Sequence, residues 1–129
     1  MRKITETATK NFFENTNYIN KNANIYIDNT YINNTNTFNT TYTLYETTIA
    51  ILTTNNHLIL NAWTHETATT KDKLNWILEK LTAYAPYLQH TYKIQQIKWN
   101  WYIIKTDKQN NEIETIIFKN LFTINLNNK

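Results

Sequence analysis

Glycine, serine, valine and cysteine are all missing from this chain of 129 residues. At the usual glycine frequency of about 7%, about nine glycines are expected in a chain of this length. Thr, Asn and Ile are instead the commonest residues, and arginine and methionine occur once each. Such a composition is expected if Thr replaced Ser, Ile replaced Val, Asn replaced Gly and Lys replaced Arg. These exchanges keep, in the same order, a hydroxyl group, a β-branched side chain, tolerance of positive φ and a positive charge. The composition therefore predicts an engineered chain with a reduced amino-acid alphabet; an AT-rich gene with strong drift is the alternative.

These absences exclude several kinds of chemistry. A chain without Gly has no standard phosphate-binding loop, dinucleotide fingerprint or EF-hand turn. A chain without Ser or Cys lacks the usual acyl-transfer nucleophiles and has no disulfide framework. The histidines His57, His65 and His90 match no metal-ligand spacing, and the carboxylates form no paired signature. We therefore expect no cofactor and no metal site, and the sequence does not support an enzyme.

The remaining composition is that of a small folded domain. Apolar residues make up 41% of the chain and aromatics 14%, which is enough to bury a core. The net charge of +3 is too small to indicate a nucleic-acid partner by itself. No apolar run approaches the length of a membrane span, and the N-terminus has no signal-type segment. These features predict a soluble, cytoplasmic protein without a membrane partner.

The clearest periodicity predicts a helix at about residues 70–84. Its apolar positions recur at helical spacing and form one stripe: Leu74, Ile77, Leu78, Leu81 and Tyr84. Thr69 is the predicted N-cap, with Asp72 three residues later as a variant of the capping box. Pro86 is expected to end the helix, because it disfavours helical geometry at the preceding residue.

Two hairpins are predicted around this helix. The first joins residues 42–53 to 57–64 through Asn55-Asn56, because Asn is the non-glycine residue that best tolerates a left-handed backbone. A two-residue loop there pairs Ile51 with Leu60 and Thr53 with Leu58, on the face expected to meet the helix.

The second hairpin joins residues 92–106 to 112–119 through the loop at 108–111. A four-residue loop sets Lys105 opposite Glu114 and Ile103 opposite Ile116, and charge pairing favours it over a two-residue loop.

The ends of the chain complete the predicted fold. An N-terminal helix is expected at residues 3–16, and a short last strand at 121–126. Residues 15–41 read as strands with polar turns, with low-complexity disorder as the alternative. The chain is thus expected to be one α+β domain: a small antiparallel sheet built from two main hairpins, packed against one amphipathic helix. Residues 42–129 form its hairpin–helix–hairpin core, and residues 1–41 the less defined N-terminal region.

Two groups of residues are candidate binding sites. The connection before the helix offers backbone N–H groups to an anion or a partner, although a simple helix cap also explains it: Trp63, Thr64, His65, Thr69, Thr70 and Lys71. A second group interleaves rings and cations as in single-strand nucleic-acid binding, although a core face beside a solvated face also explains it: Tyr92, Lys98, Trp99, Trp101 and Lys105. His65 and Glu66 could serve as an acid–base pair in a small hydrolase or lyase, although a polar loop before the helix also explains them.

One stretch resembles a known family. The segments Tyr45-Glu46-Thr47-Thr48-Ile49-Ala50, Leu58-Ile59-Leu60-Asn61 and Thr67-Ala68-Thr69-Thr70-Lys71-Asp72-Lys73-Leu74-Asn75 are similar to a family of small phage and mobile-element proteins of unknown activity. The resemblance implies an α+β fold and a mobile-element origin. Asp72 stands where that family often has His, so any role of that His is lost here. Phage proteins of this size often bind host factors, including defence systems.

These observations predict a non-enzymatic protein-binding module of phage or mobile-element type, such as an inhibitor of a host factor or defence system. A single-stranded nucleic-acid-binding protein is one alternative. A protein that tests foldability in a restricted alphabet, without retained activity, is another. A homodimer through Thr-rich edge strands fits any of these.

Overall fold

The computed structural model describes residues 2–32, 37–61, 67–119 and 121–127. These residues form two helices and nine strands in the following order: α1 (Arg2–Phe13), β1 (Tyr18–Asn20), β2 (Ile25–Ile32), β3 (Thr37–Leu44), β4 (Thr47–Thr53), β5 (His57–Leu60), α2 (Ala68–Tyr84), β6 (Thr91–Ile97), β7 (Asn100–Thr106), β8 (Glu112–Ile117) and β9 (Phe122–Asn125). The strands build a six-stranded sheet, in the order β1-β2-β3-β4-β5-β9, and a three-stranded sheet, in the order β6-β7-β8. All pairings are antiparallel, so the α+β class is confirmed.

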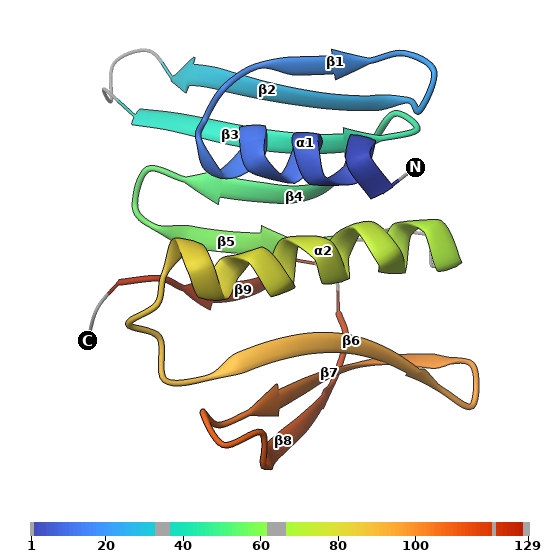
Figure 1. The fold of residues 1–129 in the computed structure, drawn as a ribbon, viewed down its shortest axis with the longest axis vertical. Coiled ribbons are helices and arrows are strands. Elements are labelled where there is room, and N and C mark those ends of the chain that lie inside the picture. Colours follow the sequence, from blue (N-terminus) through green and yellow to red (C-terminus); the bar gives the residue numbers. More distant parts are fainter. Residues whose placement is uncertain (1, 33–36, 62–66, 120, 128–129) are drawn as a thin grey trace.

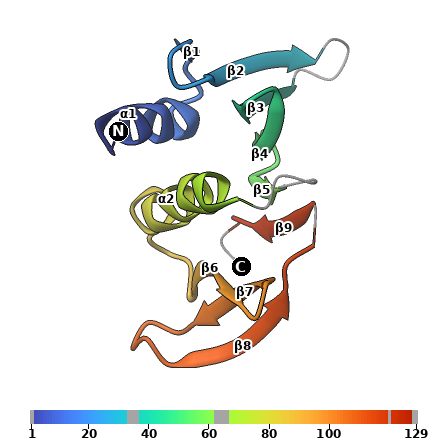
Figure 2. The ribbon, with the colours of Figure 1, turned by 90° about the vertical axis from the view of Figure 1, so that its right-hand side faces the viewer.

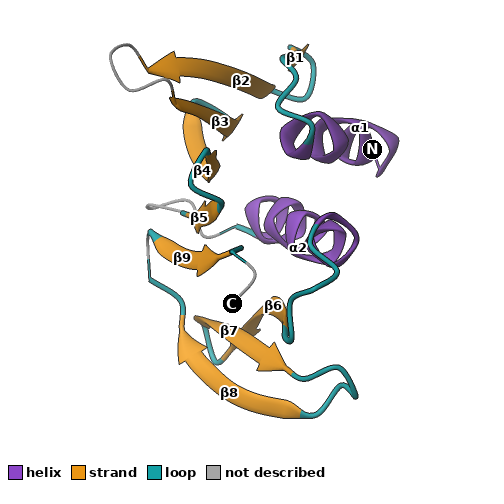
Figure 3. Cartoon of the chain, turned by 90° about the vertical axis from the view of Figure 1, so that its left-hand side faces the viewer, coloured by secondary structure: helices purple, strands orange, loops and turns teal. Residues whose placement is uncertain are grey.

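The two helices lie side by side on one face of the large sheet (Figures 1 and 2). The small sheet lies beyond α2 and β9 at the end of the molecule (Figure 3). A single hydrophobic core joins these parts, since residues of both helices and both sheets belong to one buried cluster. The expectation of one sheet on one helix was therefore too simple: there are two sheets, and α1 contributes Phe12 and Phe13 to the core.

Helix α2 follows its apolar stripe. Leu74, Ile77, Leu78 and Leu81 are buried, as predicted. The N-cap is Thr67 and not Thr69: the Thr67 hydroxyl oxygen accepts a hydrogen bond from the backbone N–H of Thr70 at 3.2 Å. The helix thus begins two residues earlier than predicted, since the N-cap oxygen bonds the N–H of the third helical residue. It ends at Tyr84, before Pro86, as expected.

Helix α1 and the N-terminal strands agree with the prediction for residues 3–41. The α1 side chains Ala8 and Phe12 are fully buried, and three strands follow in the segment for which disorder was the alternative. A polar contact joins the helices, because the Lys73 ammonium group of α2 donates to the Thr5 hydroxyl of α1 at 2.5 Å.

The first hairpin has the predicted turn but a different register. Ala50 pairs with Leu60 and Leu52 with Leu58, one residue away from the predicted pairing. The cause is a three-residue loop at 54–56, in which Asn56 alone has a positive φ, of 61°. A one-residue shift exchanges the two faces of a strand, so Leu52, predicted on the opposite face, lies in the core.

Two predicted long strands are each two strands joined by a tight turn. Residues 42–53 divide between β3 and β4 at Tyr45-Glu46, and residues 92–106 divide between β6 and β7 at Lys98-Trp99. Both residues of each turn have positive φ: 49° and 66° in the first, 48° and 74° in the second. Positive φ at both central residues is the type I′ hairpin geometry, which normally takes Asn-Gly. Bulky residues gave no signal of a turn at either place.

The β7–β8 hairpin has the predicted strand pairs but a longer loop. Lys105 pairs with Glu114 and Ile103 with Ile116, as predicted, whereas Thr106 pairs with Glu112 after a register shift, so the loop has five residues, 107–111, and not four. Asn110 turns this loop with a φ of 66°. The Asp107 carboxylate organises this loop by accepting from the backbone N–H groups of Gln109 and Asn111, both at 2.9 Å. The predicted last strand is β9, which pairs with β5.

The small sheet is fastened to α2 by one side chain. The amide of Asn75 donates to the carbonyl oxygen of Ile94 at 3.0 Å and accepts from the N–H of Ile94 at 2.7 Å. Asn75 therefore takes the place of a neighbouring strand at the outer edge of β6. No helix in the described ranges is long and apolar enough to cross a membrane.

Candidate functional site

Two hollows of the surface meet at Tyr84, the last residue of α2. Its side chain is 40% exposed, and its ring packs against Phe13 of α1, with the ring centres 4.8 Å apart. Tyr84 was predicted to belong to the buried stripe of the helix. It lies instead at the end of the helix pair, where one side of its ring meets Phe13 and the rest meets solvent. It lines two separate hollows.

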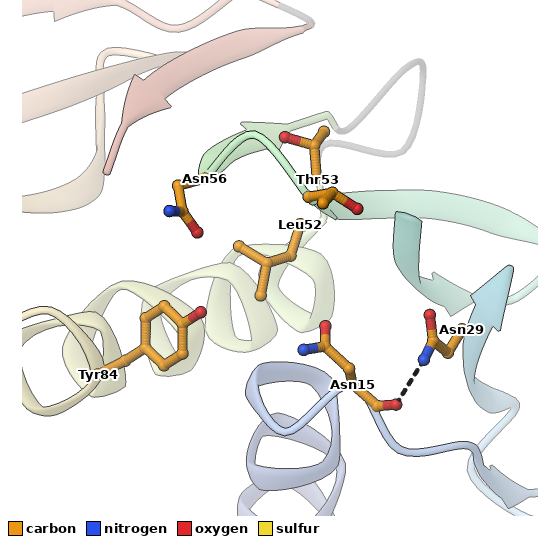
Figure 4. Close-up of a pocket in the computed structure, with 7 residues that line it drawn as sticks. Asn15, Asn29, Leu52, Thr53, Asn56 and Tyr84 are labelled. Carbon is orange, nitrogen blue, oxygen red and sulfur yellow. Dashed lines mark hydrogen bonds between the residues drawn. The ribbon is translucent and has the colours of Figure 1, made fainter. Parts of the chain in front are cut away.

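The first hollow is lined mostly by uncharged residues with amide or hydroxyl groups (Figure 4). It has a volume of about 320 Å³ and is lined by Asn15, Asn29, Leu52, Thr53, Thr54, Asn56 and Tyr84. Residues from α2, the segment after α1, and the turn between β4 and β5 thus converge on it. Its lining offers amides, hydroxyls and one ring, which suit hydrogen bonding to neutral polar groups.

Hydrogen bonds hold the amides of this hollow in place. The Asn29 side chain donates to the carbonyl oxygen of Asn15 at 2.8 Å, and the Thr40 hydroxyl donates to the Asn15 side-chain oxygen at 2.6 Å. The side-chain oxygen of Asn29 is buried and has no hydrogen-bond partner among the described residues. A buried acceptor of this kind usually has a partner in a folded protein. Because this oxygen is buried, it is not exposed to a ligand in the hollow.

The second hollow lies between the two helices. It has a volume of about 540 Å³ and is lined by Glu6, Thr9, Lys10, Phe13, Glu14, Lys80, Ala83 and Tyr84. Phe13, Ala83 and Tyr84 supply its apolar part, and two acidic and two basic side chains surround them. An apolar centre within a charged border is the anatomy of a protein-binding patch.

The shifted titratable groups lie outside both hollows. Burial, followed by the charges of Asp72 and Tyr18, raises the pKa of the Tyr42 hydroxyl far above its ordinary value. Burial also raises the pKa of Tyr92, and the backbone N–H of Asn111 lowers the pKa of Asp107. Neither hollow includes any of these three titrating side chains. Within the described ranges, no group of three His, Asp or Glu side chains is placed to hold a metal ion.

The predicted loop site can be placed only in part. Trp63, Thr64 and His65 lie outside the described residues, as does Glu66, the proposed partner of His65. Thr69 is exposed and Thr70 is buried. The N–H groups of Thr70 and Lys71 bond to the side chain and carbonyl oxygen of Thr67. In the described part of this segment, these N–H groups thus serve as the helix cap, which was the alternative interpretation.

The five residues of the predicted nucleic-acid site are not on one surface. Trp101 is only 3% exposed and packs against Phe118, so its ring is not available for stacking on a base. Lys98 and Trp99 form the β6–β7 turn, whereas Tyr92 and Lys105 pair with each other near the other end of this hairpin. The prediction of one continuous strand was the source of this error.

Sequence reasoning missed the Tyr84 surface because each of its residues had an ordinary explanation. Tyr84 completed the apolar stripe of the helix predicted at 70–84, Phe13 lay within the predicted N-terminal helix, and Asn15 and Asn29 lay in the segment 15–41, for which low-complexity disorder was the alternative. One available signal was the position of Tyr84 two residues before Pro86, where a helix ends and its last side chains leave the core. The meeting of the two helix ends depends on tertiary packing.

Comparison of the chain with protein-family models, curated proteins and solved structures found no match. The resemblance of residues 45–75 to a phage and mobile-element family therefore stays a prediction.

Proposed function

We propose that this chain is a non-enzymatic protein-binding module whose contact surface is centred on Tyr84. The observation that carries the proposal is that one half-exposed tyrosine lines two hollows with different lining residues: charged side chains border one, and uncharged amides and hydroxyls line most of the other. Tyrosine is enriched among the residues that dominate binding energy, because it combines a large apolar ring with a hydroxyl. The phage or mobile-element origin and a host factor as partner belong to the same proposal.

The chemistry of the two hollows defines the partner. Its anchor is an apolar side chain that enters between the helices and contacts Phe13, Ala83 and Tyr84. Charged groups of both signs on the partner meet the charged border, where complementary charges contribute more to specificity and association rate than to affinity. Uncharged polar groups of the partner beside the anchor meet the amides and hydroxyls of the first hollow.

A peptide-display selection tests this proposal. Short random peptides are selected on the purified chain, and the binders are measured on Tyr84→Lys and on Trp99→Lys. Both variants replace an exposed ring by a cation, and a cation near the C-terminus of α2 is favourable for the helix. We expect Tyr84→Lys to weaken binding by about 30-fold or more, the effect of losing about 2 kcal/mol at a central contact, and Trp99→Lys to leave it unchanged.

The opposite pattern would overturn the proposal. Binders that keep their affinity for Tyr84→Lys, while its thermal unfolding stays that of the parent chain, place the contact surface elsewhere. A selection that yields no binder above background on any variant is the result expected for a chain that only tests foldability.

One observation favours nucleic-acid binding as the second candidate. Trp99 is 88% exposed at the tip of the β6–β7 hairpin, beside Lys98, so a ring and a cation project together. Rings and cations of this kind stack on bases and meet phosphates. Titration of a single-stranded oligonucleotide at low salt decides this: binding that is lost in Trp99→Lys and falls with added salt supports this candidate. No binding at low salt eliminates it.

A further inference from the structure

The outer edge of β8 is open to a further strand. In the described part of the chain, β8 pairs with β7 only. The backbone N–H of Phe118 donates to the carbonyl oxygen of Trp101, so these residues form a hydrogen-bonded pair of the antiparallel ladder. Such pairs alternate along the ladder, and the N–H and C=O groups of Thr115 and Ile117 therefore point away from β7. Unpaired groups in a row are a template for another strand.

The other edges are shorter or covered. Strand β1 has three residues and β9 has four, whereas β8 has six. The edge of β6 is covered at Ile94 by the side chain of Asn75. The side chains of β8 are also unusually apolar for an edge, since Ile113 is 52% exposed and Ile117 is 58% exposed.

We propose that β8 pairs antiparallel with β8 of a second copy of this chain, with Thr115 on the two-fold axis. The two small sheets then form one continuous six-stranded sheet. This register sets Thr115 opposite Thr115 of the second copy and Ile113 opposite Ile117 in both directions. Thr–Thr pairs and pairs of β-branched residues across neighbouring strands are favourable. A two-fold interface uses the same patch twice, so one strand supplies all the contacts.

The charges of β8 fit this register. Glu114 lies opposite Ile116 and Glu112 opposite Phe118 of the second copy, so no acidic residue lies directly opposite another. Glu114 also keeps its own cross-strand partner Lys105 in the same copy. Ile113 sits where the β7–β8 register shifts, and bulges at an edge limit how far pairing extends. Because a single strand edge buries less than the roughly 1,600 Å² of a standard stable interface, the dimer is weak and depends on concentration.

Sedimentation of the full chain over a range of concentrations tests this pairing. We expect a monomer–dimer equilibrium in the parent chain and a dimer Kd raised at least about tenfold in Thr115→Lys, because two like charges then meet on the axis. The matched control is Thr123→Lys on β9, an exposed threonine on the other open edge, which leaves the Kd unchanged. A parent chain that stays monomeric up to its solubility limit overturns the proposal. A dimer broken by Thr123→Lys instead places the interface on β9.

A crosslink gives the register independently. The chain has no cysteine, so Thr115→Cys introduces a single thiol. Paired residues on the axis have Cα atoms about 5.5 Å apart, within the range that a disulfide spans. Oxidation is expected to link two copies of Thr115→Cys and to leave Thr123→Cys monomeric. Equal linking of both variants contradicts the proposed axis.

Discussion

Replacing Lys98-Trp99 by Asn-Gly is expected to stabilise the fold. Both residues have left-handed backbone angles in the β6–β7 turn. This conformation costs an L-amino acid about 1–2 kcal/mol per residue, and glycine avoids the cost while asparagine reduces it. Glycine loses more conformational entropy on folding, by about 0.5–1 kcal/mol. Trp99 is almost fully exposed, so its removal sacrifices little buried surface. The net expectation is a gain of about 1 kcal/mol.

Urea unfolding followed by circular dichroism measures this gain, and a thermal scan should show an increase in Tm of about 4 °C for a domain of this size. Gln109→Gly is the control, because Gln109 is an exposed loop residue outside the set with positive φ. Glycine at that position is expected to lower the free energy of unfolding by about 0.5–1 kcal/mol. If Asn-Gly at 98–99 is no better tolerated than the Gln109→Gly substitution, the turn does not have the left-handed geometry described above, and the reasoning fails. The Tyr45-Glu46 turn provides an independent repeat.

Three further predictions concern single side chains. Asn75→Ala should lower the free energy of unfolding by about 2 kcal/mol, because the N–H and C=O of Ile94 lose their partner; a change below about 0.5 kcal/mol in urea unfolding would show that β6 does not depend on this contact. Tyr42→Phe should leave stability unchanged or raise it by about 1 kcal/mol, because the buried hydroxyl has no hydrogen-bond partner among the described residues; a loss of stability would reveal one. The backbone N–H of Asn111 lowers the pKa of Asp107 below its ordinary value of 3.8. This carboxylate therefore stabilises the fold above about pH 4, and the stabilisation is lost as the pH falls through the lowered pKa of the folded state. An NMR titration that gives a pKa of 3.8 or more for Asp107 would contradict this.

Several local features of the fold followed from the sequence without knowledge of the tertiary structure. The stripe from Leu74 to Leu81 and the stop at Pro86 define α2, because helical periodicity and proline geometry act within a few residues. The pairing of Lys105 with Glu114 was set by charge across a short loop. Asn56 and Asn110 have positive φ in their turns, as the tolerance of asparagine for this backbone suggested.

The tight turns at Tyr45-Glu46 and Lys98-Trp99 were invisible because their side chains oppose the conformation they adopt. The local backbone preference of these residues favours a continuous strand at both places. The pairing of the strands on either side overrides this preference and imposes the turn. The same reason hid the difference between Trp101, which is buried, and Trp99, which is 88% exposed: alternation along one strand of 15 residues puts both on one face, whereas the chain reverses between β6 and β7.

The candidate surface was decided by packing alone. The sequence determined that Tyr84 ends the apolar stripe of its helix, since that depends only on the period of 3.6 residues, and it placed Phe13 in the N-terminal helix. Whether such a terminal ring is buried depends on where the neighbouring elements end, and α1 stops at Phe13 beside the last turn of α2. Contacts between residues 71 positions apart in the chain carry no local signature, so only the tertiary structure brought the two rings together and left Tyr84 between two hollows.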